Sequence, residues 1–553
     1  MLRRQQRRAL PEDLLTTASP PRRRLASLLD VPEIADVRAP RWFERLPRGV
    51  GAGAILAALV VISAVLRSRQ LSGELWFDEA GAIGLASQSL GSLPGALRAA
   101  GESPLYYVLL HFWIDGFGSG EAASHALSLL IGLVSIPAAM WTGWSIGGRR
   151  AGVFAAVLFA LSSFLTRYAE ETQPYELIVL LGLLATAGFV HAFVYRRRAY
   201  RWLFGVCLAL MLYTQGSALL YWFGAAVAVG LVARAGSDEH RAALLRDAGL
   251  CFGGAAIVYL PWLPTTVHQI AHASDPWHYA PLLGATIPSQ LLGSERVDVT
   301  LLIAVVVSVA PLLAADRRRT PEARIFWTLL AIPAAGLLLA RVGGFFAPIW
   351  AWRYLAPIVA PILLLGALAT ARARAVGVAA ILFCVVFLAN PSSFAPAYKS
   401  DMKDVAAELG PLLHPGDLVV VGQPEQAPLA SYYLPGGLQY ASTLGRVSEP
   451  SYMNWNGAIG RLQDADPGAT LDPLVANLKP GQQLLFVRPL TEGAQNWNGT
   501  WPQLVRRRSA QWGQILTTDT ANGTLKRVAS APQNYRSACC IADSAVLYQK
   551  PSS

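Results

Sequence analysis

Long apolar runs recur through the first two thirds of this 553-residue chain, and they restrict its fold more than any other feature of the sequence. A helix needs about 20 apolar residues to cross the hydrocarbon core of a bilayer, with a lower limit of about 17. Residues 49–66 meet this length, and further apolar runs follow until residue 390. With 53% hydrophobic and 15% charged residues, the chain is too apolar for a soluble multidomain protein. We therefore predict a polytopic α-helical membrane protein.

Composition divides the chain into three parts. Residues 1–48 are rich in Arg and Pro and lack the apolar core of a signal peptide, so they are predicted to form a disordered cytoplasmic tail. Residues 49–390 carry the apolar runs and form the predicted transmembrane domain. Residues 391–553 have an ordinary globular composition, which predicts a separate C-terminal α/β domain. Its helix-like run spans residues 400–413, and its strand-like runs span residues 418–421, 484–487 and 545–548.

The apolar runs predict about eleven transmembrane helices. They span residues 49–66, 122–146, 151–165, 177–195, 202–214, 218–232, 249–263, 300–315, 325–340, 355–371 and 376–388. The run at residues 104–117 is too short to cross and is predicted to be a re-entrant or surface helix, and residues 79–90 are predicted to form a short helix along the interface. The Arg clusters between spans then all fall on the side of the N-terminal tail, which the positive-inside rule assigns to the cytoplasm. The C-terminal domain is accordingly predicted to be extracytoplasmic.

The loops predicted on the outer side carry most of the unusual polar residues. Trp76 and Phe77 are interfacial aromatics that would hold the adjacent Asp78 and Glu79 against the membrane surface. Further carboxylates follow in two other outer loops: Glu102, Glu170 and Glu171. Each of them alone could be a hydrated loop residue, but carboxylates that arrive from three loops on one face indicate a site. One carboxylate can act as general base on an acceptor hydroxyl, and the others suit sugar hydroxyls or a divalent cation.

Arginines also occur on the outer side, where the positive-inside rule disfavours them. They are Arg167, Arg341 and Arg353. A guanidinium fork matches a phosphate bidentately, so a phosphate at headgroup level would explain these residues, while anchoring to anionic headgroups is the plainer alternative. Arg353, which lies between Trp352 and Tyr354, is the preferred phosphate ligand. The long outer loop predicted at residues 265–298 adds His268.

The net charge of +11 does not indicate a nucleic-acid partner, because the basic residues are clustered between apolar runs, where they set topology. Three cysteines lie in apolar segments and indicate no metal site: Cys207, Cys251 and Cys384. The adjacent Cys539 and Cys540 fit either a strained vicinal disulfide or two free thiols. The sequence leaves the metal requirement open.

Four segments together resemble the GT-C membrane glycosyltransferases, in particular the protein mannosyltransferase and aminoarabinose transferase branch. They are Trp76-Phe77-Asp78-Glu79, Glu102-Ser103-Pro104-Leu105-Tyr106-Tyr107, Arg167-Tyr168-Ala169-Glu170-Glu171 with Pro174-Tyr175, and Arg353-Tyr354-Leu355. The resemblance covers about residues 49–390. It implies that Asp78 is the catalytic residue, that the donor is a polyprenyl-phosphate sugar, and that transfer inverts the anomeric centre. The chain departs from the family pattern in having Glu102-Ser103-Pro104 where many members have His-Pro-Pro, which leaves the role of Glu102 open.

Substrate-binding roles follow from the same resemblance and from the outer position of the residues around Asp78. These residues are Glu79, Glu102, Arg167, Glu170, Glu171, Tyr175, His268, Arg353 and Tyr354. The composition resembles that of actinobacterial proteins, among which such enzymes build the mannan and arabinan of the cell envelope. We therefore expect transfer of mannose or arabinofuranose to an envelope glycolipid, polysaccharide or protein at the outer face of the plasma membrane.

A transporter or flippase of lipid-linked or envelope precursors is the alternative from another functional class, because helices broken by Pro and Gly also line translocation paths. Two observations count against it. The unusual charges lie in outer loops rather than at the middle of the membrane, and no matching pair of broken segments indicates an inverted repeat.

Overall fold

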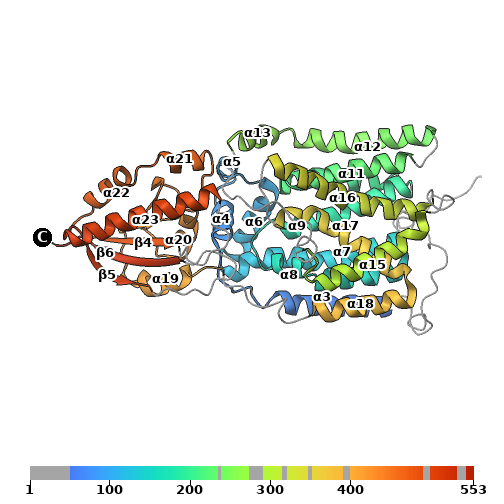
Figure 1. Ribbon diagram of the computed structural model, residues 1–553, viewed down its shortest axis with the longest axis horizontal. Helices are drawn as coiled ribbons and strands as arrows, with labels where there is room; N and C mark the ends of the chain where they lie inside the picture. The colour runs from blue at the N-terminus through green and yellow to red at the C-terminus, as the bar shows by residue number, and fades with distance from the viewer. Residues whose placement is uncertain are drawn as a thin grey trace, which may run out of the picture.

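The computed structural model describes residues 50–234, 238–272, 291–313, 320–346, 352–389, 399–489, 499–531 and 543–552. Figure 1 shows a bundle of long helices and, beyond one end of the bundle, a smaller part that contains a β-sheet. The predicted tail at residues 1–48 and the pair Cys539 and Cys540 lie outside the described residues.

Helices that lie along the long axis of the molecule build the bundle (Figure 1). They are α3 (Val50–Arg67), α7 (Glu121–Leu161), α9 (Tyr175–Phe189) with the π-helical turn η1 (Val190–Val194), α10 (Tyr200–Thr214), α11 (Ala218–Arg234), α12 (Asp238–Tyr259), α15 (Glu295–Val309) with η2 (Ala310–Leu313), α16 (Pro321–Phe346), η3 (Trp352–Leu355) with α17 (Ala356–Arg372), and α18 (Arg374–Leu388). Within the described ranges, six helices are long and apolar enough to cross a membrane, and four shorter helices are apolar as well. Every predicted span overlaps one of these helices.

Helix α7 contains two of the predicted spans in one element. Its backbone leaves the helical region at Gly148, where φ is 83° and ψ is 177°. A residue with a Cβ is strained at such a positive φ, whereas glycine adopts it freely. The chain therefore turns at Gly148, and the two halves of α7 correspond to the spans predicted at residues 122–146 and 151–165.

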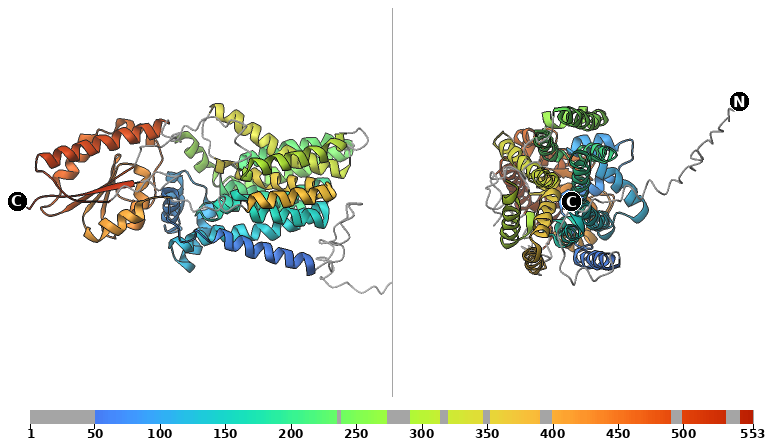
Figure 2. Two further views of the ribbon diagram at one scale, coloured as in Figure 1. Left: turned by 60° about the horizontal axis from the view of Figure 1, so that its bottom comes forward. Right: turned by 90° about the vertical axis from the view of Figure 1, so that its right-hand side faces the viewer.

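Burial separates the centre of the bundle from its rim. In the apolar stretch of Tyr175–Val194, 89% of the residues are buried, whereas in that of His240–Tyr259 only 22% are buried. The end-on view in Figure 2 accordingly shows α12 at the edge of the bundle. Large apolar side chains on α12, such as Ile257 and Val258, are exposed, as expected for a surface that faces lipid.

Short helices lie between the bundle and the sheet (Figure 1). They are α4 (Phe77–Ala86), α5 (Leu93–Ala100) and α6 (Pro104–Phe117), and two more, α8 (Ser163–Ala169) and α13 (Leu263–His272), follow later in the chain. Helix α6 has the bounds predicted for the helix that is too short to cross. The interfacial helix predicted at residues 79–90 begins and ends earlier, as α4.

The outer loop predicted at residues 265–298 is not a loop throughout, because its first residues belong to α13. Three hydrogen bonds with α5 and the residues that follow it stabilise this helix. The Arg98 guanidinium donates to the Thr265 hydroxyl at 3.3 Å, and the Gln269 amide donates to the carbonyls of Leu97 and Glu102, each at 3.1 Å.

The part of the chain from Lys399 onward is an α/β domain, here called the outer domain because it lies beyond one end of the helix bundle (Figure 1). Among its described residues, six strands form one sheet in the order β3-β2-β1-β4-β6-β5. β1 (Leu418–Val421) pairs in parallel with β2 (Gln439–Ser442) and β4 (Gln483–Pro489), and β3 (Gly445–Val447), β5 (Lys526–Ser530) and β6 (Asp543–Gln549) join by antiparallel pairing. The sequence predicts β1, β4 and β6 but misses the other three, which are short or largely exposed.

Helices cover both faces of this sheet because side chains alternate along each strand. Val419 and Val421 of β1 pack toward α19 (Met402–Leu409) and α20 (Ala427–Tyr433). Leu418 and Val420 pack on the opposite face, toward α22 (Pro467–Ala476) and α23 (Thr500–Ala521). The remaining helical segments are η5 (Gly410–Leu412), η6 (Pro424–Gln426) and α21 (Ala458–Asp464).

The core of the outer domain includes residues from the beginning of the chain. Leu75, Ala80 and Ile83, in and before α4, are buried in the same apolar cluster as Met402 and Leu429. On α4, a Cβ added to Gly84 would overlap the backbone carbonyl of Ser451 in the outer domain. Helix α4 is therefore packed as an integral element between the two domains.

We expect Gly84→Ala to separate α4 from the outer domain, because the added methyl group has no space and overpacking typically costs about 1–3 kcal/mol. The apparent melting temperature in detergent should fall by several degrees. Gly95→Ala on α5 is the matched control, since a Cβ there meets nothing within 4 Å. Equal melting temperatures for the two variants would contradict the close approach at Gly84.

Candidate active site

The first turn of α4 carries two adjacent carboxylates, Asp78 and Glu79. Negative charge is favourable there because the backbone N–H groups at a helix N-terminus are exposed and carry partial positive charge. Glu79 Oε2 accepts a hydrogen bond from the Trp76 backbone N–H at 3.1 Å, which fixes the start of the helix. Successive side chains on a helix point about 100° apart. The two carboxylates therefore reach different surroundings.

Glu79 is completely buried in a network of donors. Lys399 Nζ lies 2.9 and 3.0 Å from its two carboxylate oxygens, the His125 ring donates to Oε1 through Nε2 at 2.8 Å, and the Thr172 backbone N–H donates to Oε1 at 3.0 Å. Burial alone would raise the pKa of Glu79, but the charges of Lys399 and His125 outweigh burial and lower it below the usual range. Glu79 is thus an ionised structural anchor, and it does not line the pocket described below.

The His125 ring is itself fixed on both sides. Its Nδ1 lies 2.8 Å from the Leu71 carbonyl and its Nε2 lies 2.8 Å from Glu79. Both ring nitrogens therefore have a hydrogen-bond partner, which fixes the orientation of the ring. His125 thereby connects α7 to the start of α4.

Asp78 points the other way, and its side chain is 30% exposed. Its Oδ2 lies 3.5 Å from Arg353 Nη2, and its backbone carbonyl accepts a hydrogen bond from the Gln173 amide at 3.0 Å. Burial raises the pKa of the Asp78 carboxyl, with Arg353 acting against this shift and Glu79 adding to it. A carboxylate with a raised pKa and open access is suited to accept a proton.

Glu102 approaches Asp78 from the segment between α5 and α6. Burial raises the pKa of Glu102 to about 7; its hydrogen bond with Tyr107 opposes the shift, and the neighbouring Asp78 adds to it. Two carboxylates that share a site rarely ionise together. An ionised Asp78 therefore disfavours ionisation of Glu102.

Arg353, in η3, lies beside Asp78. Its guanidinium carbon lies 5.3 Å from the Trp76 ring centre and 5.7 Å from the Tyr354 ring centre, so aromatic faces flank it. Its side chain is 20% exposed. The group is held in place near Asp78 while part of it remains accessible to an anion.

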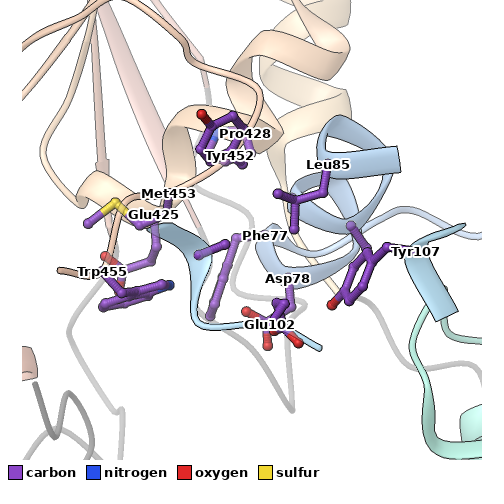
Figure 3. Close-up of a pocket in the computed structure, with 13 residues that line it drawn as sticks. Phe77, Asp78, Leu85, Glu102, Tyr107, Glu425, Pro428, Tyr452, Met453 and Trp455 are labelled. Atoms are coloured by element: carbon purple, nitrogen blue, oxygen red, sulfur yellow. The ribbon is translucent and has the colours of Figure 1, made fainter. Parts of the chain in front are cut away.

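A pocket lies at Asp78, between the membrane part and the outer domain (Figure 3). From the membrane part it is lined by Phe77, Asp78, Glu102 and Tyr107, and from the outer domain by Glu425, Tyr452, Met453 and Trp455, among others. The outer-domain residues were not predicted, because nothing in the sequence indicates that segments more than three hundred residues after Asp78 meet it. Three carboxylates and four aromatic side chains therefore line this pocket, which offers both charged groups and flat ring surfaces.

Glu425 is the carboxylate that the outer domain contributes. It is buried, and its Oε1 accepts hydrogen bonds from Trp501 Nε1 and Gln423 Nε2, both at 2.8 Å. Burial raises the pKa of Glu425 to about 7, against the effect of the Trp501 hydrogen bond. Its position is therefore fixed by the core of the outer domain.

The other predicted site residues lie beside the Glu79 network or away from the pocket. Arg167 Nε lies 3.4 Å from Glu171 Oε1, Glu170 Oε1 accepts the Gln70 backbone N–H at 3.2 Å, and the buried Tyr175 ring contacts Tyr168 at 4.7 Å between ring centres. His268 stacks on His272 within α13, at 4.1 Å, and does not line the pocket. Among the described residues, no group of three or more His, Cys, Asp and Glu side chains is arranged to hold a metal ion.

No protein-family model and no curated protein sequence matches this chain, but solved structures do. ArnT from Cupriavidus metallidurans in the apo state matches with a TM-score of 0.60 and 13% sequence identity, over 90% of this chain and 98% of ArnT. ArnT bound to undecaprenyl phosphate gives a TM-score of 0.59 and 13% identity, over 89% and 97% of the two chains. This chain has the ArnT fold.

A second protein has the same architecture. The Archaeoglobus fulgidus oligosaccharyltransferase tethered to an acceptor peptide matches with a TM-score of 0.52 and 12% identity, over 85% of this chain and 72% of the archaeal chain. The polytopic helical fold predicted from the sequence is thereby confirmed, while the GT-C assignment and the number of spans remain predictions. The mannosyl or arabinosyl branch remains a prediction.

The burial of Glu79 predicts a large stability difference between the two adjacent carboxylates. Glu79→Gln leaves Lys399 buried without its counter-charge, a loss that typically costs about 3–5 kcal/mol. Asp78→Asn removes a partly exposed carboxylate and should leave the thermal unfolding midpoint near that of the unmodified protein. Differential scanning fluorimetry in detergent would measure both, and an unfolding midpoint for Glu79→Gln as high as that of Asp78→Asn would show that the network does not stabilise the fold.

Proposed function

We propose that this protein is an inverting membrane glycosyltransferase that moves a sugar from a polyprenyl-phosphate donor to an acceptor hydroxyl. The observation that carries the proposal is the pairing of an accessible carboxylate of raised pKa, Asp78, with the Arg353 guanidinium at 3.5 Å, beside a pocket between two domains. The fold lends support, because ArnT has been solved with undecaprenyl phosphate bound.

In this mechanism Asp78 accepts the proton of the acceptor hydroxyl as its oxygen attacks the anomeric carbon of the donor sugar. A new glycosidic bond forms while the bond between the anomeric carbon and the phosphate oxygen breaks. The leaving polyprenyl phosphate carries the negative charge away, and Arg353 stabilises this charge with its planar pair of N–H donors. Attack from the side opposite the phosphate inverts the anomeric centre.

The remaining predicted residues divide between two roles in this proposal. Glu102 and Tyr354 lie close enough to Asp78 and Arg353 to bind substrate. Glu79 and Glu170 support the site through Lys399, and Arg167 supports it through its ion pair with Glu171. Tyr175 interacts electrostatically with Asp78 and Arg353, which is consistent with a place near the substrate. No contact of His268 with the pocket supports a role for it in binding.

The finer assignments stay proposals. Mannose and arabinofuranose are the proposed sugars, and an envelope glycolipid, polysaccharide or protein is the proposed acceptor. We propose a plasma-membrane location with the N-terminus in the cytoplasm and the outer domain outside. The up-and-down order of the bundle helices supports this orientation. It brings the turns that carry Arg149, Arg198 and Arg374 to the end away from the outer domain, and the positive-inside rule favours the cytoplasm for such turns.

Asp78→Asn tests the proposed base, because the amide is nearly isosteric but cannot accept the proton. Transfer from polyprenyl-phosphate mannose or polyprenyl-phosphate arabinofuranose should fall by about 100-fold or more. The measurement is release of polyprenyl phosphate by purified protein supplied with an envelope lipid extract as acceptor.

Asp115→Asn on α6 is the control, since this aspartate is exposed and outside the pocket. Equal rates for the two variants would remove Asp78 from the mechanism. If the unmodified protein moves the intact donor across vesicles without releasing polyprenyl phosphate, the transporter alternative is right instead.

Arg353→Lys tests the proposed phosphate contact. Lysine keeps the charge but lacks the planar fork, so the donor should bind at least several-fold more weakly while the fold is retained. Titration with polyprenyl phosphate, followed by intrinsic fluorescence, measures this affinity. Arg98→Lys is the control, because Arg98 is bonded to Thr265 rather than facing the pocket. Unchanged affinity in Arg353→Lys would reject the contact.

A further inference from the structure

Lys399 is an unusual residue because its charged group is buried at the junction of the two domains. Its side chain is only 8% exposed. Lysine is almost never buried unless it is paired. Here Nζ bonds to both oxygens of Glu79, at 2.9 and 3.0 Å, and donates to the Glu170 carbonyl at 2.7 Å. One ammonium group therefore joins α4 to the turn between α8 and α9.

The residues next to Lys399 strengthen this connection. The Ser400 hydroxyl donates to the Leu75 carbonyl at 2.9 Å, and the Leu75 N–H donates to the Tyr433 hydroxyl at 2.9 Å. Both backbone groups of Leu75, in the segment that leads into α4, are thus hydrogen-bonded to the outer domain. The position of α4 depends on the outer domain as much as on the bundle.

Within the described part of the chain, the Asp78 side chain makes one ion pair, with Arg353 at 3.5 Å, and it is 30% exposed. Its location is consequently determined by the backbone of the first turn of α4, where Glu79 is the adjacent residue. Whatever holds Glu79 also sets the direction in which Asp78 points.

We propose that Lys399 is a positioning residue for glycosyl transfer, which holds Asp78 in its reactive orientation through Glu79 and the Glu170 carbonyl. This inference rests on the proposed function. It makes the outer domain a structural component of the catalytic centre, because the residue that aligns the base belongs to that domain. Lys399 touches neither the donor nor the acceptor in this scheme.

Lys399→Met tests the inference, because methionine keeps an unbranched stem of similar length and loses the ammonium group. Misplacement of a catalytic group by about 1 Å can cost 100-fold in rate. We expect the kcat for release of polyprenyl phosphate to fall by about 10- to 100-fold, while the donor concentration at half-saturation changes by less than about 3-fold, since Arg353 is untouched.

Lys403→Met is the matched control. Lys403 lies four residues further along the same domain and pairs with Glu121 at 2.8 Å, but its side chain is 47% exposed. Exposed ion pairs contribute little to stability. This variant should keep both its kcat and its melting temperature.

A double variant separates positioning from stability. In Glu79→Gln/Lys399→Met, the buried carboxylate and the buried ammonium are removed together, so the melting temperature should recover relative to Lys399→Met. The donor to the Glu170 carbonyl is still missing, and the kcat should stay low. This variant also serves if Lys399→Met alone cannot be purified in folded form.

The outcomes distinguish the two proposals. Transfer by the unmodified protein, with a low kcat in the stable double variant, supports a positioning role for Lys399. Recovery of kcat together with the melting temperature would show that Lys399 serves stability alone and would overturn the inference. Absence of transfer by the unmodified protein would instead reject the proposed function itself.

Discussion

A carboxylate buried without any exposure needs strong compensation, and the arrangement around Glu79 provides it from three directions. Lys399 comes from the outer domain, His125 from α7, and the Thr172 N–H from the turn before α9. Each of these elements must be in place before the charge can be accommodated, because removal from water penalises an unpaired ion by several kcal/mol. The relative position of the outer domain, the segment around α4 and the bundle therefore depends on the Glu79 side chain.

The contrast between Asp78 and Glu79 illustrates how environment separates the roles of like residues. One carboxylate has its pKa lowered by fixed positive neighbours and is held as a permanent anion, while the next has its pKa raised by burial and keeps access to a pocket. Active sites commonly divide the functions of two carboxylates in this way. Glu79 thus fixes the position of the first turn of α4, and Asp78 provides a group there that can accept a proton.

Much of the membrane part could be predicted from the sequence, because apolar length and Arg clusters are local signals. The short helix at residues 104–117 and the turn between the halves of α7 follow from length and charge alone. Asp78, Glu102 and Arg353 could be selected because unusual charges on the outer side are rare. Glu79 was expected to face the substrate, but it is buried against Lys399. The sequence does not show which of two adjacent carboxylates faces such a partner. Glu425 and Trp455 could not be found at all, because their approach to Asp78 depends on how two domains pack.

The direction of the strands in the outer domain determines which edge of its sheet faces the helix bundle. β1, β2 and β4 are parallel, and the segment η6, which supplies Glu425, follows directly after the carboxyl end of β1. In open α/β sheets, small ligands generally bind beyond the carboxyl ends of the strands. The outer domain therefore presents its inherent ligand-binding edge to the membrane domain, so that α4 lies where a free-standing α/β protein would hold its own ligand.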